Sequence, residues 1–342
     1  MIKLKGFDGV RTIACFMVIA HHVSQVYNPS YLSDTYQLIW SLFYAGQTGV
    51  SVFFILSGAL LAYPFFYSFT NNQAMPSIKK YLARRFFRIA PAYYVTLIVS
   101  GIFAVTMFES VLNAEFIIRI ISGLTFTNAF SALTLFPTDI NGPLWSIGFE
   151  FISYLLLIVF MVVLFKYAKK QSISDALYLF AIGMVVVVAC HLGYLRFIEV
   201  EQRGAHWAFG DVGGAKTWFP YYNVFSLFAH FFIGMLASLV MVMIQNRNQS
   251  AHISFDKIII LNSVLFLVYW RFIARDTYGL FDIQYYWPVF PIYVASTLML
   301  LPYTMYMANL LDNRFFKFTA KVSFGLYLWH FLVMKVLSVT MY

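Results

Sequence analysis

The sequence predicts an all-α fold, a polytopic bundle of about nine or ten membrane-spanning helices with a cytoplasmic N-terminus. Hydrophobic residues make up 61% of the 342 residues, and only 11% are charged. A soluble globular protein is roughly half apolar and about a quarter charged, so these charges are too few to cover a water-exposed surface. Apolar runs near 20 residues long, enough to span a bilayer, recur along the whole chain. Lipid must therefore cover most of the surface.

Nine apolar segments are predicted to span the membrane: residues 9–27, 46–68, 89–108, 143–165, 174–193, 222–244, 258–275, 287–308 and 319–341. A further stretch, 112–135, is apolar but is interrupted by Arg119 and Asn128. It is either a re-entrant or interfacial helix or a tenth crossing. Because no internal repeat or linker is found, residues 1–342 are expected to form a single membrane-embedded domain without an appended soluble domain.

Basic residues predict the orientation, because Lys and Arg gather in cytoplasmic loops. With the N-terminus inside and the helices alternating, most of the 23 Lys and Arg residues fall on the cytoplasmic side. A tenth crossing would move the cluster Lys166–Lys170 outside, so nine crossings plus a partial one are favoured. The net charge of +9 therefore follows the topology and does not indicate nucleic-acid binding.

The predicted outer loops are rich in aromatic residues and carboxylates, the groups that usually hold a sugar. The longest loop contains Glu199, Glu201, His206, Trp207, Asp211 and Trp218. A belt of aromatic residues at the membrane interface is the alternative, and for any single Trp it is the more common one.

Ionisable groups inside the spanning segments are candidates for function, because they are costly in a membrane. Arg11 and His22 lie eleven residues apart in the first segment, which is almost three full helical turns. They therefore share one helix face, about 16 Å apart along the axis, while His21 points about 100° away. A histidine satisfied inside the bundle is the alternative for His22, and the face shared with Arg11 favours function.

Glu150 lies about two turns into the fourth segment, which starts at Asn141. At this depth, below the outer surface, it is predicted to meet His22 and to orient that residue as a general base. A structural buried ion pair is the alternative. His330 in the last segment lies near the middle of the membrane, where it either lines the same cavity or packs the bundle.

Two further elements carry candidate residues. Ser57 and Gly58 end an apolar run in the second segment, where small residues usually allow close helix packing. The predicted cytoplasmic run Lys79–Arg88 carries five positive charges, more than the topology needs. These charges bind either phosphates or only anionic lipid heads.

Together these motifs resemble those of the membrane acyltransferase-3 family, whose members O-acylate bacterial surface glycans and some small molecules. Five stretches carry the resemblance nearly end to end, in the family's order: FDGVRTIACFMVIAHH, GVSVFFILSG, RRFFRIAPAYY, NGPLWSIGFEFISYLL and VSFGLYLWH. The family's Arg and His, ten residues between them, correspond here to Arg11 and His22. Its Arg-x-x-Arg element corresponds to Arg85 and Arg88.

The chain departs from the family pattern in two respects. Many members have two consecutive acidic residues after Pro-Leu-Trp-Ser, whereas here Phe149 precedes the single Glu150. Many also continue past the late His with another helix, and some carry an extracellular hydrolase-like domain. Neither feature is found in this sequence. Direct acylation by the membrane domain is therefore expected.

The resemblance implies an O-acyltransferase of a bacterial inner or plasma membrane. It would move an acyl group, by default acetyl, from cytoplasmic acyl-coenzyme A to a hydroxyl of a cell-surface or lipid-linked glycan, such as a polysaccharide or lipopolysaccharide. His22 would be the general base and Glu150 its orienting carboxylate. Donor phosphates would meet Arg11, Arg84, Arg85 and Arg88, while Ser57, Trp145 and His330 would line the cavity. No metal is implied, because the histidines lack ligand spacing.

Two alternatives stay open at this point. A covalent acyl-histidine or acyl-serine relay is possible chemistry, and direct transfer is preferred only because it needs fewer groups. A transporter or flippase for a glycolipid or small anion would also place Arg, His and Glu inside the bundle. Such proteins often show inverted repeats with broken helices, and none is found in this sequence.

Overall fold

The computed structural model describes residues 4–25, 34–169, 171–198, 219–247, 255–272 and 279–340. Over these residues the regular elements are all helices, which confirms the predicted all-α class. Six described segments are long and apolar enough to cross a membrane: Ile39–Thr70, Ile78–Met107, Gly142–Tyr167, Ile173–Phe197, Val224–Asn246 and Arg314–Thr340. The chain is therefore a multi-pass membrane protein. The loop residues Glu199, Glu201, His206, Trp207, Asp211 and Trp218 lie outside the described residues.

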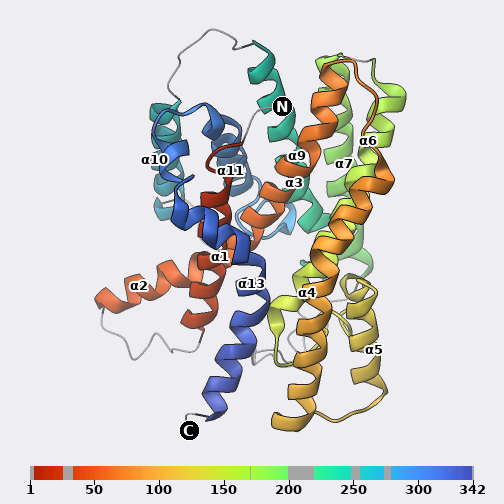
Figure 1. The fold of residues 1–342 in the computed structure, drawn as a ribbon, viewed down its shortest axis with the longest axis vertical. Helices are drawn as coiled ribbons and strands as arrows, with labels where there is room; N and C mark the ends of the chain where they lie inside the picture. Colours follow the sequence, from red (N-terminus) through yellow and green to blue (C-terminus); the bar gives the residue numbers. More distant parts are fainter. Residues whose placement is uncertain are drawn as a thin grey trace. The chain divides into compact units, whose positions relative to one another are not determined.

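Each of the nine predicted spans coincides with a helix (Figure 1). These helices are α1 (Phe7–Ser24), α3 (Gly49–Thr70), α4 (Ile78–Met107), α6 (Trp145–Tyr167), α7 (Ile173–Phe197), α9 (Val224–Arg247), α10 (Asp256–Phe272), α11 (Val289–Leu300) and α13 (Arg314–Thr340). The shorter elements are α2 (Asp34–Tyr44), η2 (Ala45–Thr48), α5 (Ala114–Leu124), η3 (Asn128–Phe130), η4 (Gly142–Leu144), η5 (Leu280–Asp282), η6 (Leu301–Tyr303) and α12 (Met307–Leu310). That α1, α10 and α11 cross the membrane, and that the N-terminus is cytoplasmic, stay predictions.

The largest difference from the predicted boundaries is at the start of α4. This helix begins at Ile78, eleven residues before the predicted span at 89, because Ser77 caps it. The Ser77 hydroxyl accepts a hydrogen bond from the backbone N–H of Lys80 (3.4 Å), as N-cap serines do. The basic run is therefore not a loop but the first three turns of a long helix.

The chain folds into two compact units. The first comprises Met1–Pro76, Leu157–Val187 and Leu227–Ser323, and the second comprises Ser77–Leu156, Val188–Ser226 and Phe324–Tyr342. The first unit contains α1, α3, α10 and α11, and the second contains α4, α5 and the start of α6.

In the first unit, two glycines allow α3 and α9 to approach closely. A Cβ atom at Gly58 would lie 2.0 Å from the carbonyl oxygen of Phe231, and one at Gly234 would lie 2.0 Å from that of Ile55. No side chain fits in either place, so the two backbones are in contact. This is the packing that small residues provide between membrane helices.

A hydrogen bond between Ser51 and His230 crosses the same α3–α9 interface. The Ser51 Oγ and His230 Nδ1 atoms are 2.8 Å apart, and both side chains are fully buried. We expect Ser51→Ala to lower the free energy of unfolding by about 0.6–1.7 kcal/mol, from the average to the maximum measured for hydrogen bonds between membrane helices. Thermal unfolding in detergent measures this change. Ser338→Ala is the control, because the exposed Ser338 hydroxyl bonds only within its own helix; equal melting of the two variants would contradict the prediction.

In the second unit, α5 runs antiparallel along α4 (Figure 1). Early in α5, Phe116 packs beside Gly101 of α4, as does Ile120 one turn later. At its end, the Tyr94 hydroxyl of α4 donates to the carbonyl oxygen of Leu124 (2.7 Å). α5 has 11 residues and so is about 16 Å long, half the thickness of a bilayer core. The segment 112–135 is therefore a short re-entrant or interfacial helix followed by irregular chain, and it is not a tenth crossing.

Buried asparagines support the irregular chain between α5 and α6. Asn128 donates from Nδ2 to the carbonyl oxygen of Trp145 (3.0 Å), and Asn141 donates to that of Leu328 on α13 (3.0 Å). Both asparagines are fully buried. Non-helical backbone at membrane depth needs such partners, because no water is there to satisfy it.

An ion pair between a buried arginine and a partly exposed aspartate stabilises the same region. The Arg119 Nη2 atom of α5 lies 2.6 Å from Asp139 Oδ1, and Arg119 Nε donates to the carbonyl oxygen of Phe136 (2.8 Å). Arg119 is only 3% exposed. The arginine that interrupts the apolar pattern of 112–135 is thus the residue that ties α5 to the following loop.

Candidate functional site

The nine predicted site residues are divided between the two units. The first unit holds Arg11, His22 and Ser57, and the second holds Arg84, Arg85, Arg88, Trp145, Glu150 and His330. The predicted contact between His22 and Glu150 joins the two units, and it stays a prediction.

α1 is one continuous helix, so Arg11 and His22 keep the shared face that their spacing predicts. Cys15 and Val18 lie between them on that face and are 0% and 1% exposed. Arg11 lies 3.8 Å from Asp8 in an ion pair one turn apart. The face that carries Arg11 and His22 is therefore buried in its middle, whereas Arg11 and His22 themselves are partly exposed.

His21 has a separate role from His22. Its Nδ1 atom lies 2.7 Å from the carbonyl oxygen of Tyr44, which only accepts, so Nδ1 carries the proton. The rings of His21 and His22 meet edge to face, with centroids 5.3 Å apart. His21 thus links α1 to the end of α2, which agrees with the prediction that it does not share the face of His22.

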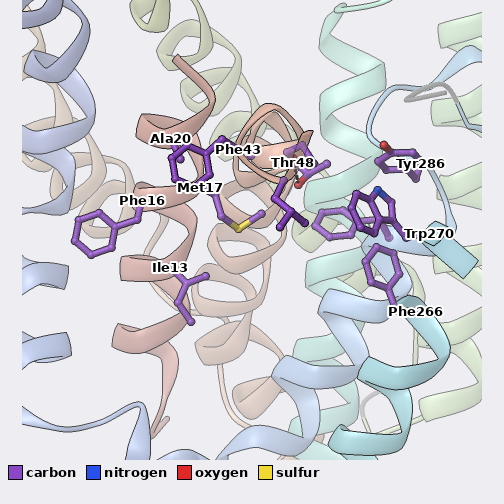
Figure 2. Close-up of a pocket in the computed structure, with 13 residues that line it drawn as sticks. Ile13, Phe16, Met17, Ala20, Phe43, Thr48, Phe266, Trp270 and Tyr286 are labelled. Carbon is purple, nitrogen blue, oxygen red and sulfur yellow. Dashed lines mark hydrogen bonds between the residues drawn. The ribbon is translucent and has the colours of Figure 1, made fainter. Parts of the chain in front are cut away.

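An apolar groove of about 430 Å³ runs along the opposite face of α1. Its α1 wall consists of Ile13, Phe16, Met17 and Ala20. The end of α2, η2, α10, α11 and the chain just before α11 complete it. Figure 2 shows the Met17 side chain pointing from α1 toward α10. Neither Arg11 nor His22 lines this groove, because their face is turned about 180° from it.

In the second unit, Glu150 belongs to a partly buried cluster with Tyr154, Tyr81 and Arg85. The Tyr154 hydroxyl donates to Glu150 Oε1 at 2.5 Å. Tyr81 and Tyr154 each interact electrostatically with both Glu150 and Arg85. The Arg85 Nε atom is buried without a hydrogen-bond partner in the described part of the chain. The predicted catalytic carboxylate and one predicted donor-binding arginine are thus neighbours.

The Glu150 cluster includes Arg85, which lies two turns from the start of α4. The depth of Glu150 below the outer surface stays a prediction. The segment that precedes α6 packs between α4 and α6. Phe126 in that segment stacks on Tyr93 of α4 and on Phe151 of α6, with centroids 5.5 and 4.3 Å away. α6 therefore begins well inside the unit.

The three arginines of α4 differ in exposure. Arg84 and Arg88 are exposed, whereas Arg85 is partly buried. Arg85 and Tyr81 are one turn apart and share the face that meets α6. Two positive charges are thus open to an anionic ligand, and the third lies beside Glu150.

Trp145 and His330 lie on neighbouring helices of the second unit. The Ser146 hydroxyl at the start of α6 lies 2.7 Å from the Tyr327 hydroxyl of α13, and His330 Nδ1 lies 2.8 Å from the Tyr327 carbonyl oxygen. Trp145 is 6% exposed and packs edge to face on Tyr222. Roles for Ser57, Trp145 and His330 in substrate binding stay predictions.

Sequence reasoning missed the two tyrosines of the Glu150 cluster. Tyr154 was detectable, because it follows Glu150 by four residues and so shares its helix face. Tyr81 had no such signal, since its contact depends on the packing of α4 against α6. In the described ranges, no three or more His, Cys, Asp or Glu side chains gather in a way that would hold a metal ion.

The fold and these polar groups define a multi-pass membrane protein that buries ionisable side chains inside its helical units. A family model described as an acyltransferase domain matches residues 4–341. The chain therefore belongs to the membrane acyltransferase-3 family, as its motifs indicated.

Curated relatives are bacterial. The peptidoglycan O-acetyltransferase OatA of Listeria monocytogenes is 28% identical over 49% of this chain and 26% of its own length. The acyltransferase MdmB of Streptomyces mycarofaciens is 26% identical over 45% of this chain and 38% of its own. A Staphylococcus aureus protein provisionally named an O-acetyltransferase is 23% identical over 98% of this chain and 51% of its own. The chain thus spans about half or less of the length of these relatives. No solved structure matches it.

Proposed function

We propose that the protein is an O-acyltransferase of a bacterial inner or plasma membrane, which moves an acyl group, acetyl by default, from cytoplasmic acyl-coenzyme A to a hydroxyl of a cell-surface or lipid-linked glycan. The observation that carries this proposal is the family match over residues 4–341. The names of the relatives, which include O-acetyltransferases of bacteria, support acetyl as the group transferred.

In the proposed reaction, the His22 imidazole takes the proton of the acceptor hydroxyl as its oxygen attacks the thioester carbonyl. The C–S bond then breaks, the ester forms, and the coenzyme A thiolate takes the proton from the imidazolium. Glu150 stabilises the imidazolium by its negative charge and holds the ring in orientation. Atoms and charge balance without a metal or a redox partner.

The exposed arginines of α4 support a donor site at the predicted cytoplasmic face. Guanidinium groups bind phosphates through charge-assisted, often bidentate, hydrogen bonds. Arg84 and Arg88 are open to such a ligand, and Lys79 and Lys80 lie exposed in the first turn of the same helix. Coenzyme A carries three phosphates, and the closely spaced positive charges at the start of α4 could bind them.

We expect Arg88→Ala to raise the apparent KM for acyl-coenzyme A by about tenfold, because one charge-assisted contact is lost. Initial rates at varied donor and saturating acceptor measure this change. Glu115→Ala, which removes a charge from the first turn of α5 in the same unit, is the control and should leave the donor KM unchanged. A change in acceptor KM alone would contradict the donor assignment.

A direct test of the function uses purified protein in lipid vesicles with radiolabelled acetyl-coenzyme A and isolated bacterial surface glycans. Transfer of label to glycan is the expected result. Uptake of a glycolipid or anion without transfer would instead favour the transporter alternative. Mass spectrometry of surface glycans from cells with and without the gene reports the acceptor and the acyl mass together.

A further inference from the structure

The contacts around Glu150 extend the proposed function to a residue that it does not yet include. We propose that Tyr154 is a positioning residue for Glu150, which fixes the direction of the carboxylate so that it orients the catalytic base. This inference rests on the proposed function, because it assigns a role within that reaction.

The first argument is local geometry. Tyr154 follows Glu150 by four residues in α6, so both side chains lie on one face of the helix. The distance of 2.5 Å from the Tyr154 hydroxyl to Glu150 Oε1 is in the range of a hydrogen bond to an ionised carboxylate. Such a bond uses one carboxylate oxygen and limits rotation of the side chain.

The second argument is burial. Tyr154 is only 4% exposed and lies in a helix long and apolar enough to cross the membrane. Burying a hydroxyl there without a hydrogen-bond partner costs free energy, and burying a carboxylate without hydrogen-bond donors costs more. The Tyr154–Glu150 bond meets both needs.

The third argument is the electrostatic setting, which α4 supplies. Both tyrosines of the cluster interact with Glu150 and with Arg85. Of the two tyrosines, Tyr154 donates a hydrogen bond to the carboxylate, from its hydroxyl to Glu150 Oε1. This bond is directional, so it orients the carboxylate within the charged setting.

The test is Tyr154→Phe, which removes the hydroxyl and keeps the ring. The proposal predicts a kcat about tenfold lower or more, because a hydrogen bond to a charged group is lost. The KM values for acyl-coenzyme A and for acceptor should change less than about threefold, since Tyr154 contacts neither substrate in the proposed reaction.

Tyr93→Phe is the matched control. The Tyr93 hydroxyl of α4 is also fully buried in the second unit, but it has no hydrogen-bond partner among the described residues. Its removal makes the same chemical change away from Glu150 and should leave kcat as in the wild type.

A double-mutant cycle separates positioning from a structural role. In a Glu150→Gln background, Tyr154→Phe should cause little further loss of kcat, measured by single-turnover transfer of radiolabel. A kcat unchanged by Tyr154→Phe in active wild-type protein would overturn the positioning role alone. So would a loss of equal size in both backgrounds. If the wild-type protein transfers no acyl group, the proposed function fails, and the positioning role fails with it.

Discussion

His22→Ala is expected to lower acyl transfer by about 100- to 10,000-fold, the usual contribution of a general base. Without the imidazole, the proposed general base that takes the proton of the substrate hydroxyl is missing from this face of α1. The protein should still insert and fold, because the side chain is shortened without a new charge or a large cavity. Transfer of radiolabelled acetyl groups by purified protein, together with thermal melting in detergent, measures both effects.

His21→Gln is the matched control for this experiment. His21 adjoins His22 but bonds to the Tyr44 carbonyl, a contact that the Gln amide can replace in kind. We expect the control to retain activity within about tenfold of the wild type. Full activity in the His22→Ala variant would rule out His22 as the base. Equal losses in both variants would show that α1 is merely disturbed.

Arg119→Met is expected to have the largest effect on stability. It removes the ion pair to Asp139 and the hydrogen bond to Phe136, and it leaves a carboxylate without its partner. Breaking a buried pair costs about 3–5 kcal/mol. Because the Asp139 side chain is 34% exposed, we expect roughly 3 kcal/mol, the lower end of that range. Unfolding in detergent measures the loss.

The double variant Arg119→Met/Asp139→Leu is the control for the charge. It removes both partners, so no unpaired carboxylate is left, and it should recover part of the lost stability. A double variant less stable than Arg119→Met would show that the ion pair is not the main reason for the loss.

Most of the fold was predictable because lipid imposes a simple rule on sequence. An apolar run of about 20 residues has few options other than a spanning helix, so all nine predicted segments coincide with helices. The rule fails where an apolar segment enters the membrane region without spanning it. The stretch 112–135 has the composition of a span, but Arg119 and Asn128 fold it back through long-range partners that no local pattern contains.

The candidate site was predictable only where its residues share a helix. The common face of Arg11 and His22 follows from helical geometry alone. The neighbourhood of Glu150 does not, because it depends on where α6 starts relative to α4. The charge of Arg85 could be counted in the sequence, but its partial burial beside Glu150 required the packing of two helices.

The chain between α4 and α6 can change in length without changing the topology of the helices that follow it. α6 runs antiparallel to α4: Phe151 is linked through Phe126 to Tyr93, whereas Tyr154, further along α6, interacts with Tyr81, nearer the start of α4. Because α4 and α6 run in opposite directions, the chain between them, from α5 to η4, adds no net crossing of the membrane. Residues inserted or deleted there would alter the surroundings of Glu150 while every later helix keeps its direction.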